Sequence, residues 1–392
     1  MKLVFYSIIL NNHQANVADS LWELTNHNYC FVELVKPNDG NQKGGMENYG
    51  SRPYLLRAWE SDENYCKAME LALTAECCVF SGLSALPFEK ARMKKGLLSF
   101  DMSERWLKKG WKNLFSPTIL RMFLAYHLGG WKYKHMYKLC CSGFAADDQR
   151  KLLTFKNKCY KWGYFTFVDD FDIDAPQYIS SSRTLIKLMW CARYIILKHP
   201  ELPVMMARRL KENGYNFRLD MYGEGEFKSR TIELAKKLGV DDVVRFIGNK
   251  PNKELMADMR QHEIFLFTSD RHEGWGAVAN ECMANGCVLV SSSDIGSTPY
   301  LIENGKTGFS FRSPASSSNF DNPDMAAIDD LYHKVEWLLR HDENRKKMRH
   351  NAHRLMIEVY SPRTAAERLL SLIDNLNKGR DTEYLDGPCS KA

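Results

Sequence analysis

Short apolar runs separated by amphipathic stretches recur along the chain. The amphipathic stretches at residues 226–238, 252–261 and 277–285 have helical periodicity. Buried strands are predicted by the apolar runs at residues 3–10, 29–35, 77–80, 217–222, 243–247, 264–267 and 288–291. Strands that alternate with helices indicate parallel sheets covered by helices on both faces. We therefore expect an α/β protein built from doubly wound domains.

The length of the chain and one polar segment predict two domains. A chain of 392 residues exceeds one ordinary hydrophobic core. The polar stretch DDFDIDAPQYISSSR, interrupted by Pro176, is a natural connection. We expect a first domain at residues 1–170 and a second at residues 171–360. Residues 361–392 are expected to form a C-terminal helix that packs back toward the first domain, followed by a tail.

Composition is that of a soluble globular protein, with 44% hydrophobic and 26% charged residues. The apolar run at residues 3–10 is too short to span a membrane, and no small-residue cleavage site follows it. The spacing of the eleven cysteines fits neither a disulfide framework nor a zinc site. These features lead us to expect a cytoplasmic protein.

The net charge of +6 is unevenly distributed. Between Glu89 and Phe165 there are 17 Lys and Arg against 5 Asp and Glu, a local charge of +12. Aromatic side chains alternate with lysines in this stretch: Trp106, Trp111, Phe115, Phe123, Trp131 and Tyr133 with Lys108, Lys109, Lys112, Lys132 and Lys134. The pattern suits peripheral attachment to an anionic membrane at the inner face of the cell. Nucleic-acid binding and a solvated face over a core helix produce similar patterns. We favour the membrane and expect no nucleic-acid partner.

The most informative local pattern is SDRHEGWGAVANECMANGCVLVSSS, residues 269–293. Glu273 falls in the loop after the strand expected at residues 264–267, and Glu281 lies on the following helix. Gly274 and Gly276 allow the backbone to approach a ligand closely, and a helix N-terminus attracts phosphate oxygens. A carboxylate can accept hydrogen bonds from two neighbouring hydroxyls, such as those of a ribose. The spacing therefore suits a nucleotide sugar, with one glutamate on the sugar and the other on the ribose.

Four segments in this order resemble the donor site of retaining glycosyltransferases of the GT-B fold, and specifically glycosyltransferase family 4. They are CARYIILKHPEL, MYGEGEFKSRTIELAKKLGVDDVVRFIGNK, the Glu273–Glu281 pair with CMANGCVLVSS, and DIGSTPYLIENGKTGFSF. The resemblance covers most of residues 185–372. It implies two Rossmann-like domains that face a central cleft, with the nucleotide sugar bound by the second domain. Tyr300, Ala192 and Cys287 depart from the family pattern and leave the identity of the donor open.

The resemblance also implies roles for individual residues. Glu273, Arg193 and Lys198 would carry catalysis, with the two cations neutralising the departing diphosphate. The donor would be bound by Glu281, Gly274, Trp275, Gly276, Ala277, Gly223, Gly225, Phe246 and Ile247. The triplets Asp170-Phe171-Asp172 and Asp172-Ile173-Asp174 resemble metal-binding sequences of other glycosyltransferases, but they lie in the expected connection. With Arg193 and Lys198 present, we expect no metal cofactor.

The first domain offers fewer signals. Asn12, His13 and Gln14 follow the first strand and are candidates for binding the acceptor, although a polar loop histidine is an equally good interpretation. Related enzymes place a histidine near the end of another strand of this domain, where LLSFDMSERW offers Asp101 and Glu104 instead. Either carboxylate is a candidate for holding the acceptor hydroxyl or the sugar.

These features predict a hexosyltransferase that moves a sugar, with retention, from a nucleoside diphosphate sugar to a glycan or a lipid-linked acceptor. Such a reaction fits the assembly of surface polysaccharides. Two alternatives stay open: a nucleotide-sugar-binding module without transferase activity, and a nucleotide-sugar epimerase of the same fold.

Overall fold

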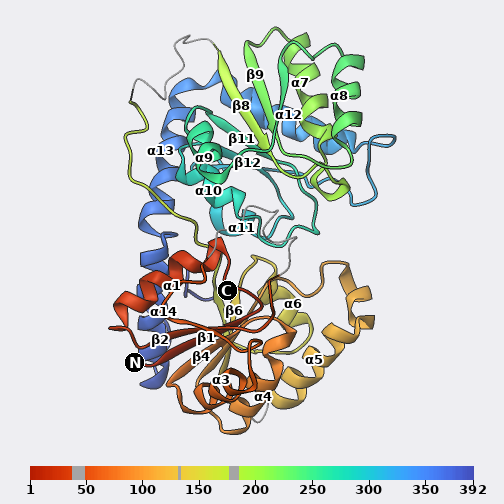
Figure 1. Cartoon of the computed structure of the whole chain (residues 1–392). Coiled ribbons are helices and arrows are strands. Elements are labelled where there is room, and N and C mark those ends of the chain that lie inside the picture. The colour runs from red at the N-terminus through yellow and green to blue at the C-terminus, as the bar shows by residue number, and fades with distance from the viewer. Residues whose placement is uncertain (38–48, 131–133, 176–184) are drawn as a thin grey trace. The chain divides into compact units, whose positions relative to one another are not determined.

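The computed structural model describes residues 1–37, 49–130, 134–175 and 185–392, which divide into two compact units. The first unit comprises Met1–Thr166 and Val359–Ala392, and the second comprises Phe167–Glu358. The domain boundaries expected at residues 170 and 360 lie within a few residues of these divisions. Each unit has its own sheet with helices around it (Figure 1). The predicted α/β fold class is confirmed.

The sheet of the first unit has seven parallel strands in the order β3-β2-β1-β4-β5-β6-β7. The strands are β1 (Leu3–Ser7), β2 (Tyr29–Glu33), β3 (Leu55–Arg57), β4 (Cys77–Phe80), β5 (Ser99–Ser103), β6 (Met136–Cys140) and β7 (Cys159–Lys161). The helices are α1 (Asn12–Leu24), α3 (Asp62–Thr74), η1 (Leu83–Ala85), α4 (Leu86–Lys94), η2 (Gly110–Phe115), α5 (Pro117–Gly130), α6 (Ala145–Lys151) and α14 (Pro362–Asn377).

Local chemistry explains the beginning and the end of this unit. All five residues of β1 are buried, as expected for a central strand of a parallel sheet covered on both faces. The side chain of Asn11 caps α1 by accepting hydrogen bonds from the backbone amides of His13 and Gln14. At the other end of the chain, α14 packs against α1. The tail then pairs with β7, where Cys389 N donates to Lys161 O at 2.7 Å.

The second unit has a six-stranded parallel sheet in the order β10-β9-β8-β11-β12-β13, the common Rossmann order. Its strands are β8 (Ile186–Cys191), β9 (Phe217–Tyr222), β10 (Val244–Gly248), β11 (Ile264–Phe267), β12 (Val288–Ser292) and β13 (Gly308–Phe311). Its helices are η3 (Ile196–Lys198), α7 (Glu201–Glu212), α8 (Lys228–Lys237), α9 (Asn252–Arg260), α10 (Val278–Ala284), α11 (Thr298–Leu301), α12 (Met325–Arg340) and α13 (Asp342–Glu358). Helices α7, α8 and α12 pack together, as do α9, α10 and α13.

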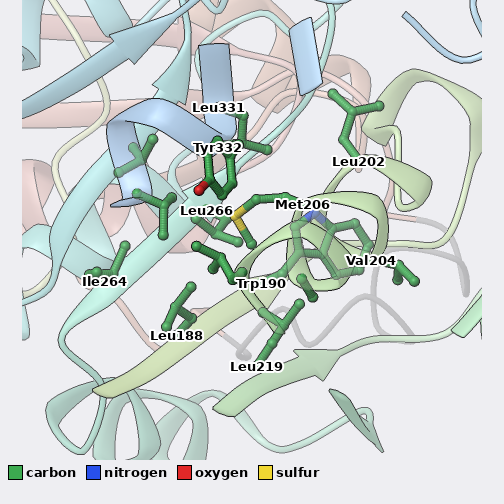
Figure 2. Packing of buried hydrophobic residues seen from close by; sticks show 14 of the residues in the cluster. Leu188, Trp190, Leu202, Val204, Met206, Leu219, Ile264, Leu266, Leu331 and Tyr332 are labelled. Carbon is green, nitrogen blue, oxygen red and sulfur yellow. The ribbon is translucent and has the colours of Figure 1, made fainter. Parts of the chain in front are cut away.

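The core of the second unit forms between its sheet and the layer of α7 and α12. Leu188 and Trp190 of β8, Leu266 of β11 and Met206 of α7 are buried there, together with Leu331 of α12. Figure 2 shows these side chains converging from strands and helices that are far apart in sequence. Burying five large apolar side chains stabilises the unit by about 1.5–3 kcal/mol each relative to exposure. This packing fixes β8 and β11, whose carboxyl ends carry the candidate site.

Candidate functional site

The candidate site lies where the strand order of the second unit reverses. The chain passes outward from β8 through β9 to β10 and then returns to β11, on the other side of β8. Ligands of doubly wound domains bind at the carboxyl ends of the two strands on either side of such a point. Arg193 and Lys198 follow β8, Glu273 follows β11, and Glu281 lies on α10. The fold therefore places all four of these predicted residues in the second unit, close to one sheet edge.

Lys198 and Glu273 form an ion pair, although they are 75 positions apart in sequence. Each side chain is only 14% exposed, so the pair is largely shielded from solvent. The Lys198 ammonium also lies 5.7 Å from the centre of the Phe267 ring. The structure thus brings together the residue predicted for the diphosphate and the residue predicted for the sugar.

The turn at Gly223 and Gly225 packs against the segment that carries Arg193. A Cβ atom on Gly223 would lie 2.0 Å from the Ala192 carbonyl oxygen, and one on Gly225 would lie 2.5 Å from that of Tyr194. Only glycine permits this approach, and both residues have positive φ. The Arg193 side chain is exposed and makes no hydrogen bond or ion pair with any residue that the structure describes. Its guanidinium is therefore available to an anionic ligand.

Glu281 is partly buried, and its carboxyl group is poorly solvated. Burial raises the pKa of Glu281 to about 7, against the opposing effect of a hydrogen bond from the Asn252 side chain. Burial also raises the pKa of the Cys191 thiol to about 12, an effect that the charge of Glu281 increases and the charge of Lys198 opposes. The charges of Glu281 and Lys198 therefore both act at the last residue of β8.

The residues that follow Glu273 fix the conformation of its loop. Trp275 is fully buried, and its Nε1 donates to Asn280 Oδ1 at 2.7 Å. A Cβ atom on Gly276 would lie 2.2 Å from Phe267 Cζ. Gly274 is buried, and Ala277 is the N-cap residue of α10. Trp275, which was predicted to bind the donor, thus holds the loop in place with a side chain that points into the protein core.

Phe246 and Ile247 lie on β10, at the edge of the sheet. The pairing of β10 with β9 shifts between Phe246 and Gly248, so Ile247 is an extra residue in the ladder. Phe246 packs against the core, and both side chains are partly buried. The irregularity thus interrupts the regular pairing of β10 with β9 at Ile247.

The aspartates of the DDFDID segment have partners within the second unit. Asp169 pairs with Arg260 at 3.0 Å, and Asp174 pairs with His350 at 3.1 Å. Asp172 accepts a hydrogen bond from the Asp174 backbone amide, and Asp170 lies 3.9 Å from His353. These contacts therefore hold the segment against α9 and α13. Within the part of the chain that the structure covers, no group of three or more His, Cys, Asp or Glu side chains has the geometry of a metal site.

His13 and Gln14 lie on the first turn of α1, at the carboxyl end of β1. They border a cavity of about 20 Å³, enough for one water molecule, whose other walls include Phe5, Met102 and Trp162. Burial lowers the pKa of His13 to about 4, so this imidazole is neutral at pH 7. His13 Nδ1 and Gln14 Oε1 are buried without a hydrogen-bond partner in the described chain. Asn12, beside them, accepts a hydrogen bond from the Tyr49 hydroxyl at 3.2 Å.

Tyr164 connects His13 to Glu104. Its ring stacks on the His13 imidazole with the centroids 5.4 Å apart, and its hydroxyl donates to Glu104 Oε1 at 2.8 Å. Glu104 also pairs with Lys108 at 2.6 Å. The structure thus places Glu104 and His13 in one polar cluster of the first unit. Sequence analysis missed Tyr164 because only the return of the chain after β7 brings it back to α1.

Asp101 occupies a different environment, because it is buried beneath the surface. It forms an ion pair with Lys138, which is fully buried, and it accepts a hydrogen bond from the Tyr126 hydroxyl at 3.0 Å. Tyr126 also lies 2.7 Å from the Glu89 carboxyl group, whose pKa burial raises well above its usual range. This internal network occupies the Asp101 carboxylate, so we no longer assign Asp101 to the acceptor or the sugar.

The basic aromatic stretch divides between core and surface. Trp106 is buried in a core cluster with Tyr126, and Phe123 packs partly against that cluster. Trp111, Phe115, Leu120 and Leu124 of η2 and α5 are exposed. The expectation that Trp106 lies at a membrane surface is therefore wrong, because this side chain completes the core. Trp131, Lys132 and Tyr133 lie outside the described residues.

Residues 185–355 match the protein family described as "Glycosyl transferases group 1". The chain carries a group 1 glycosyl transferase domain. The group 1 domain contains Arg193, Lys198, Glu273 and Glu281, four of the residues to which the resemblance to glycosyltransferases gave roles. That resemblance is confirmed at the level of the group 1 family.

Two curated relatives also match within limited regions. WcaL of Escherichia coli K12, provisionally named a colanic acid biosynthesis glycosyltransferase, is 29% identical over 140 residues, which cover 34% of this chain and 34% of WcaL. A D-inositol 3-phosphate glycosyltransferase of Corynebacterium aurimucosum is 33% identical over 97 residues, which cover 25% of this chain and 23% of that enzyme. The chain thus matches about a third or less of the length of these relatives.

Solved structures resemble nearly the whole chain. Anabaena Alr3699/HepE, solved in complex with UDP, superposes with a TM-score of 0.68 at 14% identity, over 95% of this chain and 100% of HepE. A glycosyltransferase from Rickettsia africae gives a TM-score of 0.67 at 12% identity, over 96% and 98% of the two chains. At these identities the likeness concerns the fold. Together with the group 1 domain, it identifies the fold as GT-B, which confirms the predicted architecture of two Rossmann-like domains.

Proposed function

We propose that this chain is a retaining glycosyltransferase that moves a sugar from a nucleoside diphosphate sugar to a glycan or lipid-linked acceptor in surface polysaccharide assembly. The observation that carries the proposal is the shielded Lys198–Glu273 ion pair, together with the unpaired Arg193, at the strand-order reversal of a group 1 domain. HepE binds UDP, which supports a nucleoside diphosphate donor. WcaL is named for colanic acid biosynthesis, which supports a role in polysaccharide assembly.

The second unit holds the donor in this proposal. The Glu281 carboxylate accepts hydrogen bonds from the ribose hydroxyls, and Glu273 does so from hydroxyls of the transferred sugar. Arg193 and Lys198 bind the diphosphate oxygens, so Lys198 exchanges its contact with Glu273 for one with the donor. Negative charge grows on the diphosphate as the bond to the sugar breaks, and the two cations stabilise this charge most in the transition state.

Retention follows from attack on the face that the diphosphate leaves. The bond between the anomeric carbon and the diphosphate oxygen breaks, and a bond from that carbon to the acceptor oxygen forms on the same side. The departing phosphate oxygen takes the proton of the acceptor hydroxyl. In the first unit, we assign acceptor binding to His13, Gln14 and Glu104, with Tyr164 connecting them. Two of these groups have buried polar atoms without partners, and neutral His13 can donate or accept a hydrogen bond.

The proposal predicts turnover without a metal ion. With UDP-, GDP- or TDP-sugars of α configuration, NMR should show an α-linked or α-anomeric product, and millimolar EDTA should leave the rate unchanged. Arg193 and Lys198 supply the charge that a divalent cation would otherwise provide. Inversion of the anomer, or loss of activity with EDTA that Mn²⁺ restores, would contradict this mechanism. Binding without turnover would indicate a binding module, and an epimerised donor would indicate an epimerase.

We further propose that η2 and α5 rest on an anionic membrane at the inner face of the cell, where a lipid-linked acceptor would lie. Residues 105–146 contain eight Lys or Arg and no Asp or Glu. Phe115 is 89% exposed and Trp111 is 58% exposed, which is unusual for large apolar side chains. Among the described residues, no helix has both the length and the apolar content that crossing a membrane requires. The surface therefore suits attachment in the headgroup region.

The membrane proposal predicts salt-sensitive sedimentation with liposomes. The full chain should sediment with phosphatidylserine vesicles at low ionic strength and be partly released by high salt, because each basic residue near the surface contributes about 1 kcal/mol. Replacing Lys109, Lys112 and Arg121 by Glu should abolish sedimentation and leave nucleotide binding intact. The matched control replaces three exposed lysines of the second unit, Lys236, Lys237 and Lys347. If the wild-type protein stays in the supernatant at every salt concentration, the membrane proposal is contradicted.

A further inference from the structure

The turn that carries Lys198 ends at a residue with an unusual backbone conformation. The short helix η3 is followed by His199, whose φ of 46° and ψ of 59° lie in the left-handed region. Residues with a Cβ atom rarely adopt this conformation, and glycine is the usual choice. A histidine at this position therefore points to a contribution from its side chain.

The His199 imidazole is fully buried between two carboxylates. Nδ1 lies 2.9 Å from Glu201 Oε1 on α7, and Nε2 lies 3.7 Å from Asp270 Oδ2 in the loop after β11. Burial by itself lowers the pKa of His199, but the two neighbouring carboxylates, Asp270 and Glu201, outweigh it and raise the pKa to about 9. His199 is therefore a buried cation at neutral pH. His272, next in the same loop, also contacts the Asp270 carboxylate at 3.0 Å.

Asp270 belongs to the loop that presents Glu273. Its backbone amide donates to the Leu197 carbonyl at 2.9 Å, and its carbonyl accepts from the Glu273 amide at 3.1 Å. The Thr268 hydroxyl also donates to the Lys198 carbonyl at 2.7 Å. The loop of Lys198 and the loop of Glu273 are thus joined by two hydrogen bonds to the residues that directly precede His199.

We propose that His199 is a positioning residue whose imidazolium joins the loop of Lys198 to the loop of Glu273. It fixes the two side chains that face the diphosphate and the sugar, and it touches neither ligand itself. The inference rests on the proposed function, since the spacing of Lys198 and Glu273 matters for turnover only if both act on a donor. The linkage between the two loops can be measured independently of any reaction.

Two substitutions at His199 test the contribution of the imidazolium while keeping the backbone conformation. Glycine and asparagine both adopt the left-handed region readily, so His199→Gly and His199→Asn keep the turn and remove the cation. We expect kcat to fall about tenfold to a hundredfold, because small displacements of catalytic groups have effects of this size. The KM for the donor should change within about twofold. His333→Asn, an exposed histidine on α12, is the matched control and should leave both constants unchanged.

Hydrogen exchange of the full chain without substrates tests the linkage by itself. In the two His199 variants, the backbone amides of Asp270 and Glu273 should exchange at least about tenfold faster than in the wild type, whereas His333→Asn should leave them unchanged. Unchanged exchange in a folded variant would overturn the inference, as would wild-type kcat in both variants. If the wild type turns over no nucleotide sugar and exchange still accelerates in the variants, the proposed function fails while the linkage stands. Should one variant fail to fold, the other decides.

Discussion

Replacing Lys198 by methionine is expected to lower kcat by about 100- to 1,000-fold, the usual effect of removing one group that stabilises transition-state charge. The donor KM should change much less, because the charge on the diphosphate is greatest in the transition state. Methionine keeps most of the apolar length of the lysine side chain and removes the cation. It also leaves Glu273 unpaired in a position that is 14% exposed, so a modest loss of stability should accompany the loss of activity.

Arg193→Ala provides an informative comparison with Lys198→Met. Arg193 is exposed and has no side-chain partner among the described residues, so its removal leaves no buried group unsatisfied. The kcat of Arg193→Ala should fall to a similar degree as that of Lys198→Met, while its melting temperature should stay at the wild-type value. Lys236→Met, at an exposed position on α8, controls for the loss of a surface charge. A near-wild-type kcat in Lys198→Met would show that Lys198 does not stabilise the departing diphosphate.

The second large effect is expected on nucleotide affinity. Glu281→Ala should weaken binding of a nucleoside diphosphate by about 1.5–3 kcal/mol, the contribution of hydrogen bonds to a charged group. This corresponds to about 10- to 150-fold in Kd, measured by titration calorimetry. Glu233→Ala, an exposed glutamate on α8, is the matched control. If Glu281→Ala binds the nucleotide with unchanged affinity, the Glu281 carboxylate does not bind the ribose.

The pKa of Glu281 predicts how this affinity depends on pH. Burial raises the pKa of the free carboxyl group to about 7, so protonation competes with ribose binding below that value. If only the carboxylate accepts the ribose hydroxyls, lowering the pH from 8 to 6 should raise Kd by about tenfold. Affinity falls with falling pH because the nucleotide binds the ionised form of Glu281. The Glu281→Gln variant should lose this pH dependence, whereas the Glu233→Ala control should keep it.

Strands with uninterrupted apolar runs could be predicted from the sequence with their correct bounds. β4, β9 and β11 begin and end where the runs at residues 77–80, 217–222 and 264–267 do. β8 was not predicted, although it is central, because Lys187 interrupts a short run that contains no valine. β3 and β7 have only three residues each, and their pairing depends on neighbouring strands rather than on local pattern.

The donor side of the site could be predicted because its residues follow strands in a recognisable order. Glycine positions were equally informative, since Gly223, Gly225 and Gly276 each stand where a Cβ atom would collide with the backbone or with Phe267. Sequence alone could not reveal that Trp275 points inward or that Asp101 is buried with Lys138. An alternation of lysine and tryptophan likewise says nothing about which aromatic side chain completes the core.

His199 shows why some parts of a site escape prediction. No sequence signal marks a left-handed histidine, because the residue that normally occupies that conformation is glycine. Its role emerges only when the fold brings Asp270, 71 positions away, to within 3.7 Å of its ring. Tyr164 was missed for the same reason, since its contact with His13 joins distant parts of the first unit.

The central claim is that the group 1 domain binds a nucleoside diphosphate sugar through Glu281, Arg193 and Lys198. The most direct measurement is the free energy of unfolding of the full chain in the presence of UDP, GDP and TDP. One of these nucleotides, at a hundred times its Kd, should stabilise the wild type by about 2.7 kcal/mol. At the same concentration it should stabilise Glu281→Ala by much less. If none of the three shifts the unfolding of the wild type at millimolar concentration, the second unit is not a donor site and the account is contradicted.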